Sequence, residues 1–504
     1  MFVEILTALL IGPVVCILIQ YVKHLSELHK YPKGAFPLPL IGNLNLVLGK
    51  KPFTSLRDLS EKYGEVFSLS FGMERIVIIN DVINAKEALM SKGLDYSARP
   101  NFYSTSFIDG GNGITFNINP KASLFMRKLV APYIRMHGAH LQQMEEITIA
   151  ESEDLIRVLA KKNGEPLDPQ YQFACSMTNV ICGLQFGKRY QVDEEEFRRI
   201  HKYSEILTTA VRSGVPIDVF PWLRFFPSES LRLLKEAKRI QAVFKEKYWQ
   251  HKNTFDERNL RDLIDHLILS SKADASKWKE LGYEGSNIDE NIIATMQDLI
   301  IGGSETVKTM LYWSILFLLH WPQYQDEIYT ELQQNVQGKS PRLSDQVKCH
   351  LTRAFINEVF RYVTIAPLGV PYKTTRDTIL GTKSIPKGAQ VIVNYWAIHH
   401  DPNYWDHPDE FIPQRWLNEA GEFEGNTNKG FYPFSMGRRS CPGDVLAKME
   451  LFIIFSSVVY NFEILPSDEE NLPSLEGHTG VSRIPEDYKC VFKPRNMEEA
   501  LNNA

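Results

Sequence analysis

The sequence has few cysteines and no pattern that would join them. Its 504 residues contain six cysteines, and no two of them form a Cys-x-x-Cys pair or a dense group. This scarcity argues against a disulfide framework and indicates reduced thiols in a cytosol-like compartment. An excess of positive charge is also missing, because the formal net charge is −5. The composition therefore gives no reason to expect nucleic-acid binding.

Internal repeats, low-complexity blocks and a second domain boundary are absent as well. Apolar residues make up 44% of the chain and charged residues 23%, as in an ordinary globular protein with an ample core. The length exceeds the usual size of one domain, but large single-domain enzymes of this length exist. We therefore expect one large domain over residues 45–504.

A single long uncharged run is present near the N-terminus, over residues 5–22, between Glu4 and Lys23. A membrane-spanning helix needs about 17–25 such residues. A cleaved signal peptide is the competing interpretation, but the run exceeds the usual ~7–15 apolar residues and no basic segment precedes it. The basic residues that follow predict a cytosolic location for the rest of the chain. We expect an uncleaved transmembrane anchor over residues 1–22, then a stiff, basic and proline-rich hinge over residues 23–44.

Helical periods dominate the remaining sequence, and short strands interrupt them. Residues 66–69 and 76–79 are predicted strands of a hairpin, and short strands are also expected within residues 367–375 and 391–394. Residues 98–113 form a polar, glycine-rich loop, which is a candidate lid. The predicted fold class is mainly α with small β-sheets.

A long helix is predicted in the middle of the chain, because an apolar helical period runs from residue 292 to residue 319. Asn287 and Glu290 resemble a capping box at its start, and Trp321-Pro322 ends it. Roughly 30 residues at ~1.5 Å each give about 45 Å, which is enough to cross a whole domain.

Two adjacent glycines, Gly302 and Gly303, interrupt this helix. Each glycine costs a helix interior about 1 kcal/mol relative to alanine, so the pair indicates a purpose. One interpretation is close packing against a neighbouring helix. The other is room for a flat ring, with the Thr306 hydroxyl bonding back to a carbonyl and bending the helix.

A lone cysteine, Cys441, lies in a glycine-punctuated loop over residues 434–443. The apolar run from residue 445 to about residue 465 predicts a buried helix directly after it. A cysteine at a helix N-terminus is favoured as a thiolate, which can ligate haem iron. A buried cysteine that only packs is the alternative.

The cysteine loop resembles the haem-thiolate loop of the cytochrome P450 family, Phe-x-x-Gly-x-Arg-x-Cys-x-Gly. Phe434, Gly437, Arg439, Cys441 and Gly443 fill every fixed place. The resemblance extends over essentially the whole chain. It implies the cytochrome P450 fold with an N-terminal transmembrane anchor helix, and haem b (iron protoporphyrin IX) as the cofactor with Cys441 as the axial iron ligand.

The glycine pair is part of a second resemblance, to the oxygen-binding groove of the family, Ala/Gly-Gly-x-Asp/Glu-Thr. Gly302, Gly303, Glu305 and Thr306 fill its places. The resemblance implies that Thr306 hydrogen-bonds dioxygen and that Glu305 helps to relay protons. A hydroxyl beside a carboxylate is a sensible proton path into an apolar pocket.

A third resemblance concerns three charged residues. Glu358 and Arg361 share one face of a helix predicted over residues 351–363. Together with Arg415 they are similar to the Glu-x-x-Arg helix and Pro-x-Arg loop of the family, which implies a buried network that holds the loops beside the haem. An orphaned buried charge costs about 3–5 kcal/mol, so losing any of the three predicts protein without haem.

The haem propionates need cationic partners, and arginine suits them best. The resemblance assigns this role to Arg439, to Arg127 and to Arg99. Two positions depart from the family pattern, because Ser123 stands in place of a tryptophan and Tyr372 in place of a histidine that is frequent in close relatives.

The resemblance also implies which segments surround the substrate. An aromatic and proline cluster at residues 216–227, between helices predicted over residues 194–212 and 229–250, would roof the chamber and dip into the membrane; packing between those helices is the alternative. The other implied walls are Ile114 and residues 298–302, 366–370 and 479–481.

The implied activity is that of a haem-thiolate monooxygenase, which inserts one oxygen atom of O₂ into a lipophilic substrate. A steroid, a fatty acid or a xenobiotic is plausible, and a steroid 17-alpha- or 21-hydroxylase is one alternative. Two rival classes are an O₂-independent haem-thiolate isomerase or dehydratase and a non-catalytic haem sensor. The intact Glu305-Thr306 pair argues against the isomerase or dehydratase.

The implied electron donor is NADPH, through the membrane-bound NADPH-cytochrome P450 reductase, with cytochrome b5 as a second possible partner. The implied location is the endoplasmic reticulum membrane, with the catalytic domain on the cytosolic side. The reductase would dock on the cysteine side of the molecule, where Lys121, Arg127, Lys128, Arg135 and Arg438 offer positive charge.

Overall fold

The computed structural model of the protein describes residues 2–48, 51–135, 139–212, 216–338, 340–425 and 428–496. Helices make up most of the structure and the strands form small sheets, as the sequence predicts. The α-helices are α1 Phe2–Ser26, α2 Pro52–Tyr63, α3 Val82–Lys86, α4 Thr105–Ile108, α5 Pro120–Ile134, α6 Ala139–Ala160, α7 Gln170–Phe186, α8 Glu195–Arg212, α9 Pro216–Val219, α10 Glu229–Ile240, α11 Ala242–Asn253, α12 Leu263–Ala273, α13 Ala275–Glu280, α14 Ser286–His320, α15 Pro322–Asn335, α16 His350–Val363, α17 Tyr395–His399 and α18 Asp444–Asn461.

Short helical turns and strands connect these helices. The turns that matter below are η3 Glu87–Ser91, η4 Pro221–Phe225, η6 Pro413–Trp416 and η7 Gly437–Arg439. The strands are β1 Val66–Phe71, β2 Glu74–Ile79, β3 Tyr372–Lys373, β4 Thr378–Leu380, β5 Lys383–Ile385, β6 Gln390–Val393, β7 Phe462–Pro466, β8 His478–Thr479, β9 Arg483–Ile484 and β10 Cys490–Pro494.

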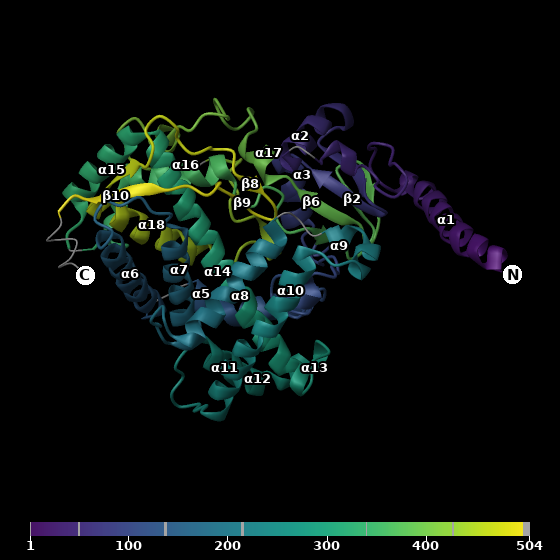
Figure 1. Ribbon diagram of the computed structural model, residues 1–504, viewed down its shortest axis with the longest axis horizontal. Helices are drawn as coiled ribbons and strands as arrows, with labels where there is room; N and C mark the ends of the chain where they lie inside the picture. The colour runs from purple at the N-terminus through teal and green to yellow at the C-terminus, as the bar shows by residue number, and fades with distance from the viewer. Residues whose placement is uncertain are drawn as a thin grey trace.

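The largest sheet has four strands in the order β1-β2-β6-β3. β1 and β2 form the predicted antiparallel hairpin, with Val66 opposite Ile79 and Phe71 opposite Glu74. β6 lies parallel to β2, and β3 lies antiparallel to β6. Figure 1 shows β2 and β6 at the end of the molecule from which α1 projects, whereas the rest is mainly helical and contains only small sheets such as that of β10.

The predicted hinge, residues 23–44, lies along β1. The Ser68 hydroxyl donates to the Pro32 carbonyl at 2.7 Å, and the Ser70 N–H donates to the Asn43 side chain at 2.8 Å. These bonds fix the path of the chain between α1 and the sheet. Among the residues that the structure describes, no helix is both long and apolar enough to cross a membrane, so the predicted anchor is not shown.

The central helix α14 passes through the core and packs against α7, α8 and α18. It begins at Ser286, after Gly285, and no side chain caps it. The predicted capping box is therefore wrong: glycine has no side chain to accept a bond, and Asn287 already lies inside the helix. Trp321 ends α14 and Pro322 begins α15, as predicted.

Two other predicted helices end elsewhere. The helix predicted over residues 229–250 is divided into α10 and α11 at Gln241, whose side-chain amide donates to the Phe107 carbonyl at 2.6 Å. The helix predicted to reach residue 465 ends at Asn461. It ends there because the next five residues form β7 and pair with β10.

Candidate active site

The cysteine loop is held by its own backbone and by two differently used glycines. The Cys441 N–H donates to the Phe434 carbonyl at 2.9 Å, which closes the loop. Gly437 has a φ of +75°, and a Cβ there would lie 2.7 Å from the Leu89 carbonyl carbon in η3, so only glycine fits. A Cβ on Gly443 would meet no atom within 4 Å, so Gly443 leaves space beside Cys441.

The middle of α14 carries an exposed strip on an otherwise buried helix. Gly302 and Thr306, one turn apart, are both exposed, while Ser304 and Glu305 between them are buried. The Thr306 hydroxyl donates to the Gly302 carbonyl at 2.7 Å, which is the predicted back-bond. The side of α14 that holds this pair therefore borders open space.

The two glycines of α14 have different neighbours. A Cβ on Gly302 would meet no atom within 4 Å, whereas a Cβ on Gly303 would lie 2.7 Å from Ile181 Cγ1 of α7. The packing interpretation is therefore correct for Gly303, and Gly302 leaves room on the open side of the helix; that a flat ring occupies this room stays a prediction.

The Glu305 carboxylate is turned away from Thr306 and toward α8. It forms an ion pair with Lys308 and accepts a hydrogen bond from the Ser204 hydroxyl at 3.2 Å. The Ser204 hydroxyl is also hydrogen-bonded to Ser304, at 3.1 Å. The structure thus places the predicted acid and alcohol on adjacent residues without a hydrogen bond between them. Lys308 and Ser204 are partners that no sequence pattern indicated.

Three predicted arginines converge on the cysteine loop and the segment before α5. Arg99 donates to the carbonyls of Val370 and Pro371 at 2.7 and 2.9 Å, and Arg127 donates to the Ser440 carbonyl. Arg439 reaches three more carbonyls, and its Nε has no hydrogen-bond partner.

These arginines are costly to bury. Burial lowers the pKa of each, and Arg99 and Arg127 help to lower the pKa of Arg439 to about 9. Within the described part of the chain, none of the three forms an ion pair with a carboxylate. Three mutually repelling cations whose hydrogen bonds go to carbonyl oxygens are suited to bind an anion.

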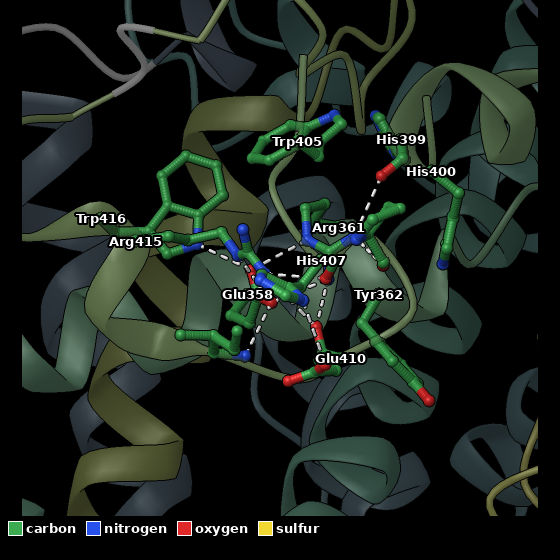
Figure 2. Close-up of polar contacts among 12 residues, drawn as sticks. Glu358, Arg361, Tyr362, His399, His400, Trp405, His407, Glu410, Arg415 and Trp416 are labelled. Carbon is green, nitrogen blue, oxygen red and sulfur yellow. Dashed lines mark hydrogen bonds and ion pairs between the residues drawn. The ribbon is translucent and has the colours of Figure 1, made fainter. Parts of the chain in front are cut away.

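The predicted charge network is fully assembled (Figure 2), with Glu358 and Arg361 buried and Arg415 partly exposed. The Arg361 guanidinium donates to both oxygens of Glu358, at 3.0 and 2.8 Å, and Arg415 Nε donates to Glu358 at 3.1 Å. The indole N–H of Trp416 and the N–H of Ile412 complete the carboxylate shell at 3.0 and 2.9 Å.

The network is also connected to the segment that leads to the cysteine loop. Arg361 donates to the carbonyls of His399, Pro408 and Glu410, all within 3.0 Å. The ring of His399 in turn accepts a hydrogen bond from the Tyr432 N–H at 2.9 Å. Burial and the charge of Arg361 lower the pKa of His399 to about 3, so this ring is a neutral link.

A family model described as cytochrome P450 matches residues 32–492. The chain belongs to the cytochrome P450 family. A steroid 17-alpha-hydroxylase/17,20 lyase of Gallus gallus is 35% identical over 456 residues, which cover 89% of this chain and 89% of the relative. Enzymes with the same description from Squalus acanthias and Rana dybowskii are 32% and 34% identical, over 96% and 93% of this chain and 96% and 91% of their own lengths.

The P450 fold and the monooxygenase activity that the sequence predicts are thereby confirmed. The protein is a haem-thiolate oxidoreductase, and haem iron is the cofactor that the family implies. The residues fit that group. Cys441 is exposed, Gly302 leaves one side of α14 open, and the cluster of Arg99, Arg127 and Arg439 forms no ion pair among the described residues.

The thiol of this P450 is not activated by the protein in the predicted manner. Cys441 borders open space, but the protein packed around its thiol desolvates the thiolate and raises the pKa, although the Gly443 N–H and the charges of Arg127 and Lys448 oppose the shift. Cys441 lies three residues before α18, outside its first turn, so the helix N-terminus does not outweigh burial. Coordination to a metal would favour the thiolate, because a coordinating thiol is deprotonated.

The two departures from the family pattern have identifiable partners. The Ser123 hydroxyl donates to the Ile114 carbonyl at 2.9 Å, inside the core. The Tyr372 and Tyr395 hydroxyls both bond to Ser435 Oγ, at 3.0 and 2.6 Å. The guanidinium of Arg99 lies over the Tyr372 ring, 4.5 Å from its centroid. Tyr395 and Ser435 were not predicted, because their relation to the cysteine loop is visible only in three dimensions.

Proposed function

We propose that this P450 hydroxylates a steroid, with Cys441 as the axial ligand of haem b. When bound, the haem supplies the iron centre at which O₂ is reduced and one oxygen atom is inserted into the substrate. The glycines of the cysteine loop, Gly437 and Gly443, let the backbone approach the porphyrin, and Phe434 packs against Phe360 with ring centroids 5.2 Å apart.

The arginine cluster would hold the two propionates. Arg99, Arg127 and Arg439 provide the cations. The hydroxyl of Tyr372, which is hydrogen-bonded to Ser435, stands where relatives often have a histidine. A dianion there would remove the repulsion that lowers the pKa of Arg439. The network of Glu358, Arg361 and Arg415 would hold the segment that carries the cysteine loop.

Thr306 and Glu305 would handle protons. The Thr306 hydroxyl faces the open side of α14 and can donate there after releasing the Gly302 carbonyl. Glu305 lies one residue away, bound to Lys308 and Ser204, so delivering a proton toward Thr306 requires the carboxylate to leave Lys308. Lys308 would thus restrain the carboxylate between turnovers.

The observation that carries the steroid assignment is the similarity to steroid 17-alpha-hydroxylase/17,20 lyases over about nine-tenths of the chain. That description refers to attack at carbon 17 of a steroid and cleavage of its bond to carbon 20. A steroid with a two-carbon side chain at carbon 17 is accordingly the proposed substrate class.

The test is oxidation by the purified holoprotein with NADPH and the reductase. We expect such a steroid to give a product that mass spectrometry identifies as hydroxylated at carbon 17. A fatty acid or an aromatic xenobiotic of similar hydrophobicity should give little product. The Cys441→Ser variant, which lacks the thiolate, is the matched control. Preferential oxidation of the fatty acid or the xenobiotic would contradict the steroid assignment and leave the monooxygenase chemistry intact.

For the arrangement in the cell we propose an anchor at residues 1–22, a hinge at residues 23–44, one catalytic domain at residues 45–504, and a location on the cytosolic side of the endoplasmic reticulum. Exposed cations on the cysteine side support docking of the reductase or of cytochrome b5 there. These residues are Lys121, Lys128, Arg135, Arg438 and Lys448. Arg127 is excluded from this surface, because it is half-buried and bonds to Ser440.

A further inference from the structure

Two aspartates from different segments face each other inside the protein. Asp298 lies on α14, one turn before Gly302, and Asp109 lies in the loop between α4 and α5; their side chains belong to residues that are 7% and 6% exposed. A Cβ on Gly113 would lie 2.7 Å from Asp109 Oδ2 and nearer still to Asp298 Oδ2. The two oxygens are therefore within about 5 Å of each other, the range over which like charges strongly perturb ionisation.

Neither carboxyl group forms an ion pair among the described residues, although the charge of Asp298 acts on the nearby guanidinium of Arg439 and raises its pKa against the effect of burial. Three titratable side chains face the pair. Tyr203 from α8 donates to the Ile108 carbonyl. Arg99 and Arg439, the latter from η7, both donate to the Thr115 carbonyl. Lys238 from α10 and Asp218 from α9 bind before this loop, at Ser106 of α4 and at Ser104, which directly precedes α4.

The hydrogen bonds at the pair come mainly from the backbone of the loop. Asp298 accepts from the Thr115 N–H at 2.8 Å, and Asp109 accepts from the N–H groups of Gly111 and Gly113 at 2.8 and 3.0 Å. Residues 109–115 are thereby attached to α14. Gly113 has to be glycine, because any side chain would collide with both carboxyl groups.

Simultaneous ionisation of the two aspartates is unfavourable. Burial raises the pKa of Asp109, and burial followed by the charge of Asp109 raises the pKa of Asp298 well above its ordinary value. Two buried carboxyl groups this close disfavour a second negative charge, because no ion pair compensates it. A single proton held by the pair can therefore bond the loop to α14, and a doubly charged pair lacks that bond.

We propose that Asp109 and Asp298 are positioning residues: the proton that they share holds residues 109–115 against α14 and so fixes this wall of the substrate chamber. The inference rests on the proposed function, because it takes this loop as a chamber wall. A carboxyl group with a raised folded-state pKa stabilises the folded arrangement at low pH, and this stabilisation is lost as pH rises through that pKa. The wall is therefore held at low pH and released at high pH.

The test is hydrogen exchange of peptides that cover residues 109–115 in the full-length holoprotein, corrected for intrinsic exchange, between about pH 5 and pH 9. Exchange in the wild-type protein is expected to accelerate about tenfold or more across the transition, since one pKa unit is a factor of ten. In Asp298→Asn the amide donates permanently to Asp109 and its oxygen accepts from Thr115, so protection is expected to stay high and independent of pH.

Two further variants complete the design. Asp109→Asn also removes the second charge and is expected to abolish the pH dependence, which keeps the test decisive if Asp298→Asn does not fold. Asp168→Asn is the control, because burial raises the pKa of Asp168 as well, but it lies before α7, outside this loop. Wild-type exchange without pH dependence, or the same dependence in Asp298→Asn, would overturn the shared proton.

Affinity for a lipophilic steroid, followed by the spectral shift of the haem, separates this proposal from the proposed function. We expect the affinity of the wild-type protein to fall several-fold as the loop is released, and that of Asp298→Asn to stay constant. A pH-dependent loop with a pH-independent affinity supports the shared proton and counts against the chamber beside α14.

Discussion

At the scale of single residues, the arginine cluster is a site whose burial lowers the stability of the folded protein. Arg439 is buried between Arg99 and Arg127 and has only carbonyl oxygens as partners. An uncompensated buried charge costs several kcal/mol, and a cofactor anion would remove much of that cost. Arg439 is therefore expected to favour cofactor binding and to lower the stability of the cofactor-free protein.

That opposition predicts the behaviour of Arg439→Met. The haem-free variant is expected to be more stable by on the order of 1 kcal/mol, because a buried cation is replaced by an apolar chain of similar length. Haem loading is expected to fall several-fold. The stabilisation should be largest near neutral pH and vanish in strong alkali, because the folded-state pKa of Arg439 is about 9 and the unfolded chain keeps its proton to higher pH.

The measurements are urea denaturation of haem-free protein and the carbon monoxide difference spectrum of loaded protein. Arg438→Met is the matched control, because the neighbouring Arg438 is exposed and should change neither quantity. If Arg439→Met destabilises the haem-free protein, the bonds to the carbonyls of Ile114, Thr115 and Asn117 outweigh the repulsion, and Arg439 is mainly structural.

The residues with fixed spacing along the chain could be predicted from the sequence. Cys441, Thr306 and the three members of the charge network each lie in a short motif whose chemistry follows from residue type. Lys308, Ser204, Tyr395 and Ser435 could not be predicted as partners, because their contacts depend on how separate segments pack. The direction in which the metal-free protein shifts the pKa of Cys441 could not be predicted for the same reason: burial, which raises it, is a property of the folded chain.

At the scale of elements, the two glycines of α14 have different roles: Gly303 allows close packing against α7, and Gly302 leaves open space beside the helix. Gly303→Ala is expected to cost about 1–3 kcal/mol, because its Cβ would overlap Ile181 of α7 in a close-packed interior. Gly302→Ala is expected to stabilise by up to about 1 kcal/mol through helix propensity, because nothing lies near its Cβ. It should nevertheless weaken steroid binding, because it narrows the open side of the helix.

Chemical denaturation and spectral titration measure the two effects. Ile181→Ala combined with Gly303→Ala is the control, since it removes the atoms that collide and should recover part of the lost stability. Equal destabilisation by the two single variants would contradict the division of roles between the two glycines.

Element type was predictable where periodicity is long, and element ends were not. The period over residues 292–319 predicted α14, and two short strand-like runs on either side of a turn predicted the β1–β2 hairpin. The start of α14 was misplaced because glycine, not asparagine, precedes it. The division at Gln241 has no local signal, since the Gln241 side chain bonds to Phe107 of α4, which is distant in the sequence.

At the scale of the whole molecule, apolar surface gathers at the end where the chain begins. Trp222, Phe225 and Phe226 are 56%, 88% and 58% exposed. Phe36 and Leu40 of the hinge are also exposed, and the β1–β2 turn lies against both segments, because Gly72 is near Val219 and near Leu40. Figure 1 shows α9 and the base of α1 at this same end. Exposed aromatic residues beside a hinge are typical of a surface that meets a membrane.

We therefore expect the aromatic side chains of η4 to enter the lipid when the full-length protein is reconstituted in vesicles. Bromine on the lipid acyl chains quenches nearby tryptophan, and residues 1–44 contain no tryptophan, so the N-terminal segment itself gives no signal. Quenching in the wild-type protein should be largely lost in Trp222→Phe and retained in Trp249→Phe, since Trp249 is also exposed but lies on α11. Because phenylalanine keeps the surface apolar, the variant reports the position of residue 222 without changing how the protein binds. Quenching that survives Trp222→Phe would place η4 outside the lipid and favour its role as packing between α8 and α10.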